Sequence, residues 1–187
     1  MPGAIFSSIE AGMIFAIMAL GVYLSFRILD FPDLTVDGSF VTGAATASIL
    51  IINGYNPLVA TLVALLAGFL AGVVTGLLHT KGKINPLLSG ILMMIALYSI
   101  NLRIMGKSNL PLLSESTIMT GIREAWNSSG LDQVTGGILR AVGLEGTLPT
   151  TWGILLVMIV VTFLIKFAID AFLKTEVGLA LRATGDN

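Results

Sequence analysis

The sequence predicts an all-α integral membrane protein, a bundle of about five transmembrane helices. Of the 187 residues, 55% are hydrophobic and only 11% are charged, whereas a soluble domain carries roughly 25% charged residues. The mean hydropathy is +0.94. Apolar runs of about 20 residues recur along the chain, and each can cross a hydrocarbon core of roughly 30 Å as a helix. A single soluble core could not bury all of these runs.

Charge and cysteine content exclude several classes of protein. The net charge is −1, without a basic patch, so the electrostatic requirement for nucleic-acid binding is not met. The absence of cysteine excludes a disulfide framework, a thiolate metal site and a cysteine nucleophile. The N-terminus lacks the basic region and the cleavage site of a signal peptide. The first apolar run is therefore expected to remain as a membrane helix.

The first two predicted spans differ in character. The first covers residues 4–26 and ends before Arg27. A connection too polar to face lipid leads to the second, residues 38–52, which is short or broken and rich in glycine and alanine. Shortened helices that follow polar connections are often buried in protein or line a cavity. We therefore expect the second span to pack inside the bundle.

Two longer spans follow, at residues 57–79 and 85–104. In the first of them, Gly68, Gly72 and Gly76 repeat every four residues. This spacing puts all three glycines on one helix face, where another helix can approach closely. The pattern predicts helix packing and carries no chemistry.

Residues 107–150 form the one long non-spanning segment, which is predicted to be extracytoplasmic and partly helical. Amphipathic helices are expected near 116–126 and 133–142. The fifth span covers 151–173 and carries Lys166 and Asp170. These two residues are four apart and share a helix face, either as a structural pair with a snorkelling lysine or as a buried functional pair.

Alternation of the spans places the connections at 27–37 and 80–84 on the same side as the polar tail, residues 174–187. The short loop after the third span is basic, with Lys81 and Lys83. Because positive residues concentrate in short cytoplasmic loops, that side is predicted to be cytoplasmic.

No catalytic constellation is present, since the chain lacks HExxH, GxSxG, Walker and GxGxxG motifs. We therefore predict that the chain is no enzyme and binds neither a metal nor a cofactor. The acids Asp30, Asp33 and Asp37 could suggest a cation site. Helix capping and loop solvation explain them as well.

Two segments resemble a known family. Residues 26–44, FRILDFPDLTVDGSFVTGA, resemble the loop and second helix of ABC importer permeases of the branched-chain amino acid and simple-sugar type. Residues 175–187, TEVGLALRATGDN, are similar to the cytoplasmic loop that leads into the family's ATPase-docking helix. GVYLSFRILDFP and LLHTKGKIN look typical of its uncharacterised branch assigned to tryptophan, tyrosine or other amino acids.

The resemblance implies that residues 1–187 are one transmembrane permease domain of a multi-pass protein of the bacterial plasma (inner) membrane. It implies that a partner ABC ATPase holds the ATP, that an extracytoplasmic binding protein delivers a small polar solute such as an amino acid, and that two permease copies pair in the bilayer. Substrate-pathway candidates are Asp37, Ser39, Thr42 and Ser48. The ATPase-docking candidates in the 174–187 loop are Glu176, Gly178, Leu181, Arg182, Gly185 and Asp186.

Family members continue past the Gly185–Asn187 stretch with further spans, so the chain is expected to be truncated at its C-terminus. Two other functions stay open. An ion-coupled secondary transporter would use a similar broken helix, with Glu10 and Asp170 as its coupling candidates. A non-transporting membrane scaffold would need only the packing surfaces.

Overall fold

The computed structural model describes residues 2–129 and 152–185. Within these ranges the regular elements are helices, and five of them are long and apolar enough to cross a membrane. The helices are α1 (Pro2–Tyr23), which continues as a π-helical turn η1 (Leu24–Ile28), α2 (Thr35–Ile52), α3 (Pro57–Thr80), α4 (Pro86–Met105), α5 (Ile118–Ser128), α7 (Trp152–Leu173) and α8 (Glu176–Gly185). The predicted all-α membrane bundle is confirmed.

Local sequence explains where several helices begin. The side chain of Asn56 accepts a hydrogen bond from the amide of Leu58, and Asn85 does the same for Leu87. A proline occupies the first position of both α3 and α4, where its missing N–H costs nothing and its fixed φ suits a helix. At α5, the side chains of Thr117 and Thr120 each accept from the other's backbone amide. These caps fix the starting points of the helices.

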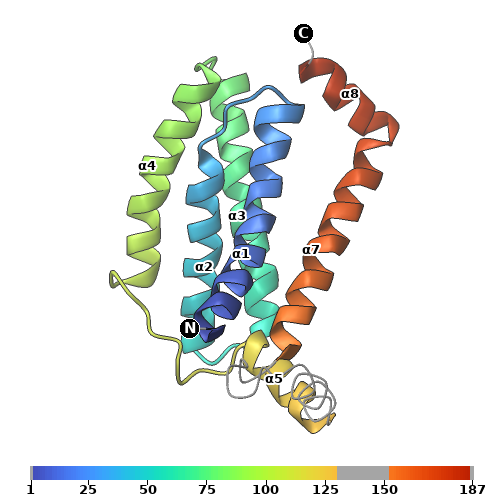
Figure 1. Cartoon of the computed structure of the whole chain (residues 1–187). Helices are drawn as coiled ribbons and strands as arrows, with labels where there is room; N and C mark the ends of the chain where they lie inside the picture. The colour runs from blue at the N-terminus through green and yellow to red at the C-terminus, as the bar shows by residue number, and fades with distance from the viewer. Residues whose placement is uncertain (1, 130–151, 186–187) are drawn as a thin grey trace.

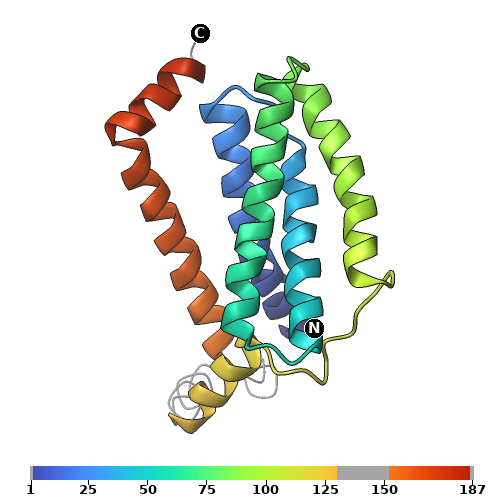
Figure 2. The same cartoon turned by 180° about the vertical axis from the view of Figure 1, so that it is seen from behind.

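The helices form two groups (Figure 1). α2 packs along α3 and α4, while α7 lies beside α1. Seen from behind, α3 crosses in front of α2, and α7 stands on the side away from α4 (Figure 2). One end of the bundle holds the 29–34 and 81–85 connections together with α8. The opposite end holds the start of α1 and α5.

The core lies between α2, α3 and α4 and consists mainly of small and hydroxyl side chains. Its buried members are Thr35, Gly38, Thr42 and Ala45 of α2, Ala60, Ala71 and Thr75 of α3, and Ser89, Gly90, Met93, Leu97 and Asn101 of α4. A Cβ at Gly90 would lie 2.8 Å from the amide nitrogen of Leu34, so glycine is required where the connection crosses α4. Small residues at such crossings let helices approach closely in a membrane.

The structure refines the predicted elements. The second span begins earlier than expected, at Thr35, and runs unbroken for 18 residues, the shortest of the five candidate spans. The tail expected as a loop forms helix α8, because Thr175 caps the amide of Gly178 and Glu176 lies in the positive first turn. The amphipathic helix expected at 116–126 is α5, two residues later. The helix expected at 133–142 lies outside the described residues.

Candidate functional site

The hydroxyl groups predicted to line a pathway on α2 are bonded to their own helix. Ser39 donates to the carbonyl oxygen of Val36 at 3.0 Å, Thr42 to Gly38 at 2.9 Å, and Ser48 to Ala44 at 2.7 Å. Each donor proton is thereby satisfied within the apolar span, which lowers the cost of placing the hydroxyl there. The oxygens keep acceptor capacity for a solute.

The four pathway candidates do not share one face. Thr42 is buried within the helix group, whereas Asp37 is exposed in the first turn of α2. Ser48 lies half-buried, and Ser39 lines a groove between α1, α2 and α3. Of the four, Ser39 is therefore the candidate that lines the groove described next, which is large enough for a small solute.

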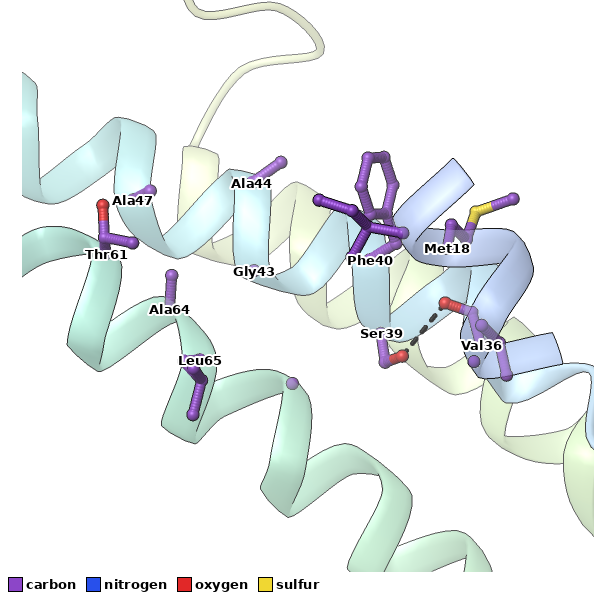
Figure 3. A pocket seen from close by; sticks show the side chains of 13 residues that line it. Met18, Val36, Ser39, Phe40, Gly43, Ala44, Ala47, Thr61, Ala64 and Leu65 are labelled. Atoms are coloured by element: carbon purple, nitrogen blue, oxygen red, sulfur yellow. Dashed lines mark hydrogen bonds between the residues drawn. The ribbon is translucent and has the colours of Figure 1, made fainter. Parts of the chain in front are cut away.

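That groove has a volume of about 540 Å³. Its walls are apolar except for the hydroxyl groups of Ser39 and Thr61, and its floor is made by small residues that hold α2 and α3 close together. Figure 3 shows Ala64 of α3 opposite Gly43 of α2. A Cβ at Gly43 would lie 3.5 Å from the carbonyl oxygen of Ala64. The groove can hold an apolar group, and the two hydroxyl oxygens in its walls can each accept a hydrogen bond from a solute.

Polar contacts hold the start of α2 and the connection before it, at the same end of the bundle as α8. The hydroxyl oxygens of Thr35 and Thr75 lie 2.9 Å apart, and both residues are 1% exposed. Asp33 accepts from the amide of Thr35 at 2.7 Å. The ring of Phe31 packs edge-on against His79, with centroids 5.2 Å apart. These contacts use the Asp33 carboxylate and the one histidine of the chain in structural roles.

The predicted glycine face of α3 meets a neighbour at one position. A Cβ at Gly68 would lie 3.6 Å from the carbonyl oxygen of Ser39, whereas Gly72 and Gly76 have open space beside them and line a second cavity. The buried face of α3 is instead the alanine and threonine face with Ala71 and Thr75. Close packing at Gly72 and Gly76 stays a prediction.

Helix α8 divides the predicted docking residues into two groups. Gly178 is buried in the corner between α7 and α8, where a Cβ would overlap the carbonyl oxygen of Phe172. Gly185 lies against the end of η1, and Leu181 is half-buried on the same face. Glu176 and Arg182 are exposed. Asp186 lies outside the described residues.

The exposed surface of α8 also carries two apolar side chains that the sequence reasoning missed. Val177 is 61% exposed and Leu179 is 55% exposed. Val177 and Leu179 are spaced at helical intervals from Ala180 and Ala183, and this spacing is the sequence pattern that could have predicted an apolar surface on the helix. Together they give α8 an outward surface that no described element covers.

The charged pair on α7 is a contact between neighbours on one helix. Lys166 and Asp170 form an ion pair at 2.5 Å, with both side chains nearly half exposed, and the ammonium group also lies 4.9 Å from the centre of the Phe167 ring. Among the described residues no group of three or more histidine or acidic side chains could hold a metal ion. Asp30, Asp33 and Asp37 do not come together as such a group.

Comparisons with known proteins identify a family and relatives for this chain. Residues 4–187 match the model of a family described as "Branched-chain amino acid transport system / permease component". A tyrosine transport system permease protein of Clostridioides difficile (strain R20291) is 42% identical over 183 residues, which are 98% of this chain and 52% of that protein.

An uncharacterized protein of Rickettsia prowazekii (strain Madrid E) is 34% identical over 115 residues, 61% of this chain and 40% of that protein. The chain spans about half the length of the curated relatives it matches. No solved structure matches it.

Proposed function

The chain belongs to the branched-chain amino acid transport system permease family, and on that premise we propose that it serves as the membrane-spanning part of an ATP-driven importer. Family membership makes it a transport permease component, a multi-pass protein of the bacterial inner membrane. The match over nearly the whole chain to a transport permease carries the proposal. ATP hydrolysis is assigned to a partner ATPase.

The ATPase is proposed to dock on the outward surface of α8. This helix lies at the end of the bundle that holds the basic 81–85 connection, the side expected to be cytoplasmic. Val177 and Leu179 supply exposed apolar anchors there, and Glu176 supplies a charge. Apolar anchors ringed by polar groups are typical of energetically important contacts.

The proposed solute is an amino acid, delivered by an extracytoplasmic binding protein and carried between two permease copies. The relative's name supports a tyrosine-like solute. The groove at Ser39 supports it too, because apolar walls suit an aromatic ring and the hydroxyl groups of Ser39 and Thr61 can bond a polar substituent. Asp37, Thr42 and Ser48 remain further pathway candidates along α2.

The first test is purification in mild detergent through an N-terminal tag, which lies at the end of the bundle opposite α8. We expect an ABC ATPase to co-purify and to be identified by mass spectrometry. Leu179→Glu should reduce its recovery about tenfold, the effect of losing roughly 1.4 kcal/mol of binding. Leu113→Glu is the matched control, because Leu113 is fully exposed between α4 and α5 at the opposite end.

Undiminished ATPase recovery with Leu179→Glu would remove α8 as the docking surface. Gly178→Trp is a poorer test, since its side chain would collide with the α7–α8 corner and disturb the fold itself. Transport that survives ATP depletion but collapses with the ion gradient would favour the ion-coupled alternative. A protein that inserts normally but neither binds an ATPase nor transports labelled tyrosine would favour a scaffold.

A further inference from the structure

Two arginines from opposite ends of the sequence meet at one polar pocket. Arg27 of η1 and Arg182 of α8 line a cavity of about 260 Å³ together with Tyr23 and Ile28. Contact between Gly185 and the end of η1 brings α8 to this position, because the absent side chain lets the backbones touch. Tyr23 and Arg27 are four residues apart and lie on the same side of the helix end.

The described residues provide no negative charge for this pocket. Their one ion pair is between Lys166 and Asp170 on α7. Arg27 and Arg182 are both exposed, and neither has a carboxylate partner within residues 2–129 and 152–185. Two guanidinium groups at one cavity repel each other, so the arrangement favours an anion between them.

An apolar groove begins where the basic pocket ends. It has a volume of about 460 Å³ and runs between Met13, Ala16, Ala19 and Leu20 of α1 and Thr162 and Phe163 of α7. Tyr23 lines both cavities, so the groove and the pocket adjoin at this residue. Lys166 also borders the groove, but its ammonium group is paired with Asp170. The groove lies within the membrane-spanning part of both helices.

We propose that this pocket and groove bind an anionic phospholipid. The headgroup phosphate lies between Arg27 and Arg182 and accepts hydrogen bonds from their guanidinium groups, which match phosphate geometry. One acyl chain lies along the α1–α7 groove. Tyr23 lies at the level of the headgroup, where tyrosine is enriched in membrane proteins. Basic pockets between helices at the cytoplasmic side suit anionic headgroups, and the lipid would join α1 to α8.

The headgroup contact is tested by native mass spectrometry of the purified protein titrated with phosphatidylglycerol and, separately, with phosphatidylcholine. We expect a preference for phosphatidylglycerol that falls about 25-fold in the double variant Arg27→Gln/Arg182→Gln, from roughly fivefold for each basic residue. The control is Arg103→Gln, an exposed arginine in the last turn of α4 at the opposite end.

Equal retention of the two lipids, or an unchanged preference in the double variant, would overturn the proposal. Arg27→Lys/Arg182→Lys keeps the charges but loses the guanidinium geometry, and should retain part of the preference. If the lysine variant loses as much of the phosphatidylglycerol preference as the glutamine variant, with its helical content unchanged, this result would contradict a phosphate held by charge.

The acyl-chain contact is tested with Ala19→Phe, which fills the groove, against Ala11→Phe on the same helix outside it. We expect weaker phosphatidylglycerol binding for Ala19→Phe only, and no displacement of the lipid by millimolar glycerol phosphate. Displacement by glycerol phosphate together with no effect of Ala19→Phe would identify a soluble phosphate as the ligand and overturn the lipid.

Discussion

The α2–α3–α4 group and the α1–α7 pair solve the problem of packing in a membrane differently. Within the most apolar stretch of each helix, 22–28% of residues are buried in α2, α3 and α4, against 6% in α1 and 11% in α7. The first group is held by small residues, close backbone crossings and the Thr35–Thr75 contact. Large exposed side chains occur in both regions, such as Leu65 of α3 and Leu164 of α7, so the buried share and the close crossings distinguish the two regions.

This difference indicates where stability and where adaptable surface reside. Apolar side chains gain no hydrophobic stabilisation by leaving lipid for protein, so close packing and hydrogen bonds must hold the helices together. The α2–α3–α4 group has both. The α1–α7 pair leaves a groove that lipid or further protein can fill. The three predictions below compare the two regions.

The largest effect is expected from adding a side chain at a close crossing. Gly90→Leu should lower the free energy of unfolding by about 3 kcal/mol, since the Leu34 backbone would have to move. Gly12→Leu on α1 should change it little, because no atom lies within 4 Å of the added Cβ. Unfolding in mixed micelles measures both. Similar losses of stability for the two variants would mean that the two regions do not differ in how closely their helices pack.

A substitution that creates a cavity should also affect the two regions differently, but with a smaller difference in the free energy of unfolding. Leu97 is 3% exposed and packs with Ala71 and Met93, so Leu97→Ala should cost about 2 kcal/mol through the space it leaves. Leu164 of α7 is 62% exposed. Leu164→Ala should cost less than about 0.5 kcal/mol. The same unfolding experiment compares them, and an equal cost would mean that α7 is covered in the assembled protein.

The smallest effect is expected from the buried hydroxyl pair. Thr35→Val and Thr75→Val each keep the side-chain shape and remove one hydroxyl group of the contact. A double-mutant cycle should give a coupling of about 0.6 kcal/mol, the average for hydrogen bonds between membrane helices. A coupling of zero would mean that each hydroxyl group is satisfied by its own helix, as Thr75 is in part by the carbonyl oxygen of Ala71.

Helix positions follow from the sequence because their signals are local. An apolar run sets the length of each span, and the Asn-Pro pairs at residues 56–57 and 85–86 set the starts of α3 and α4. The predicted spans agree with the observed helices to within a few residues. The family could also be predicted from the sequence, because its motifs at 26–44 and 175–187 are continuous stretches.

Contacts between helices could not be predicted in the same way. A glycine face permits a neighbour without requiring one, so the repeat at Gly68, Gly72 and Gly76 could not reveal that only Gly68 meets α2. A hydroxyl side chain buried between helices looks in sequence like one that lines a groove, which is why Thr42 could not be told from Ser39. Arg27 and Arg182 are too far apart in sequence for any local pattern to connect them.

The helix pairing also predicts the order in which the helices can associate while the protein is being synthesised. α2, α3 and α4 are consecutive, so each can meet its neighbour soon after it enters the bilayer, with short connecting loops to close. α1 is made before α2, yet its main partner α7 follows only after α5 and residues 130–151 have been made. Until α7 is made, α1 has only its smaller contact with α2, and its exposed apolar side chains suit a lipid environment during that interval.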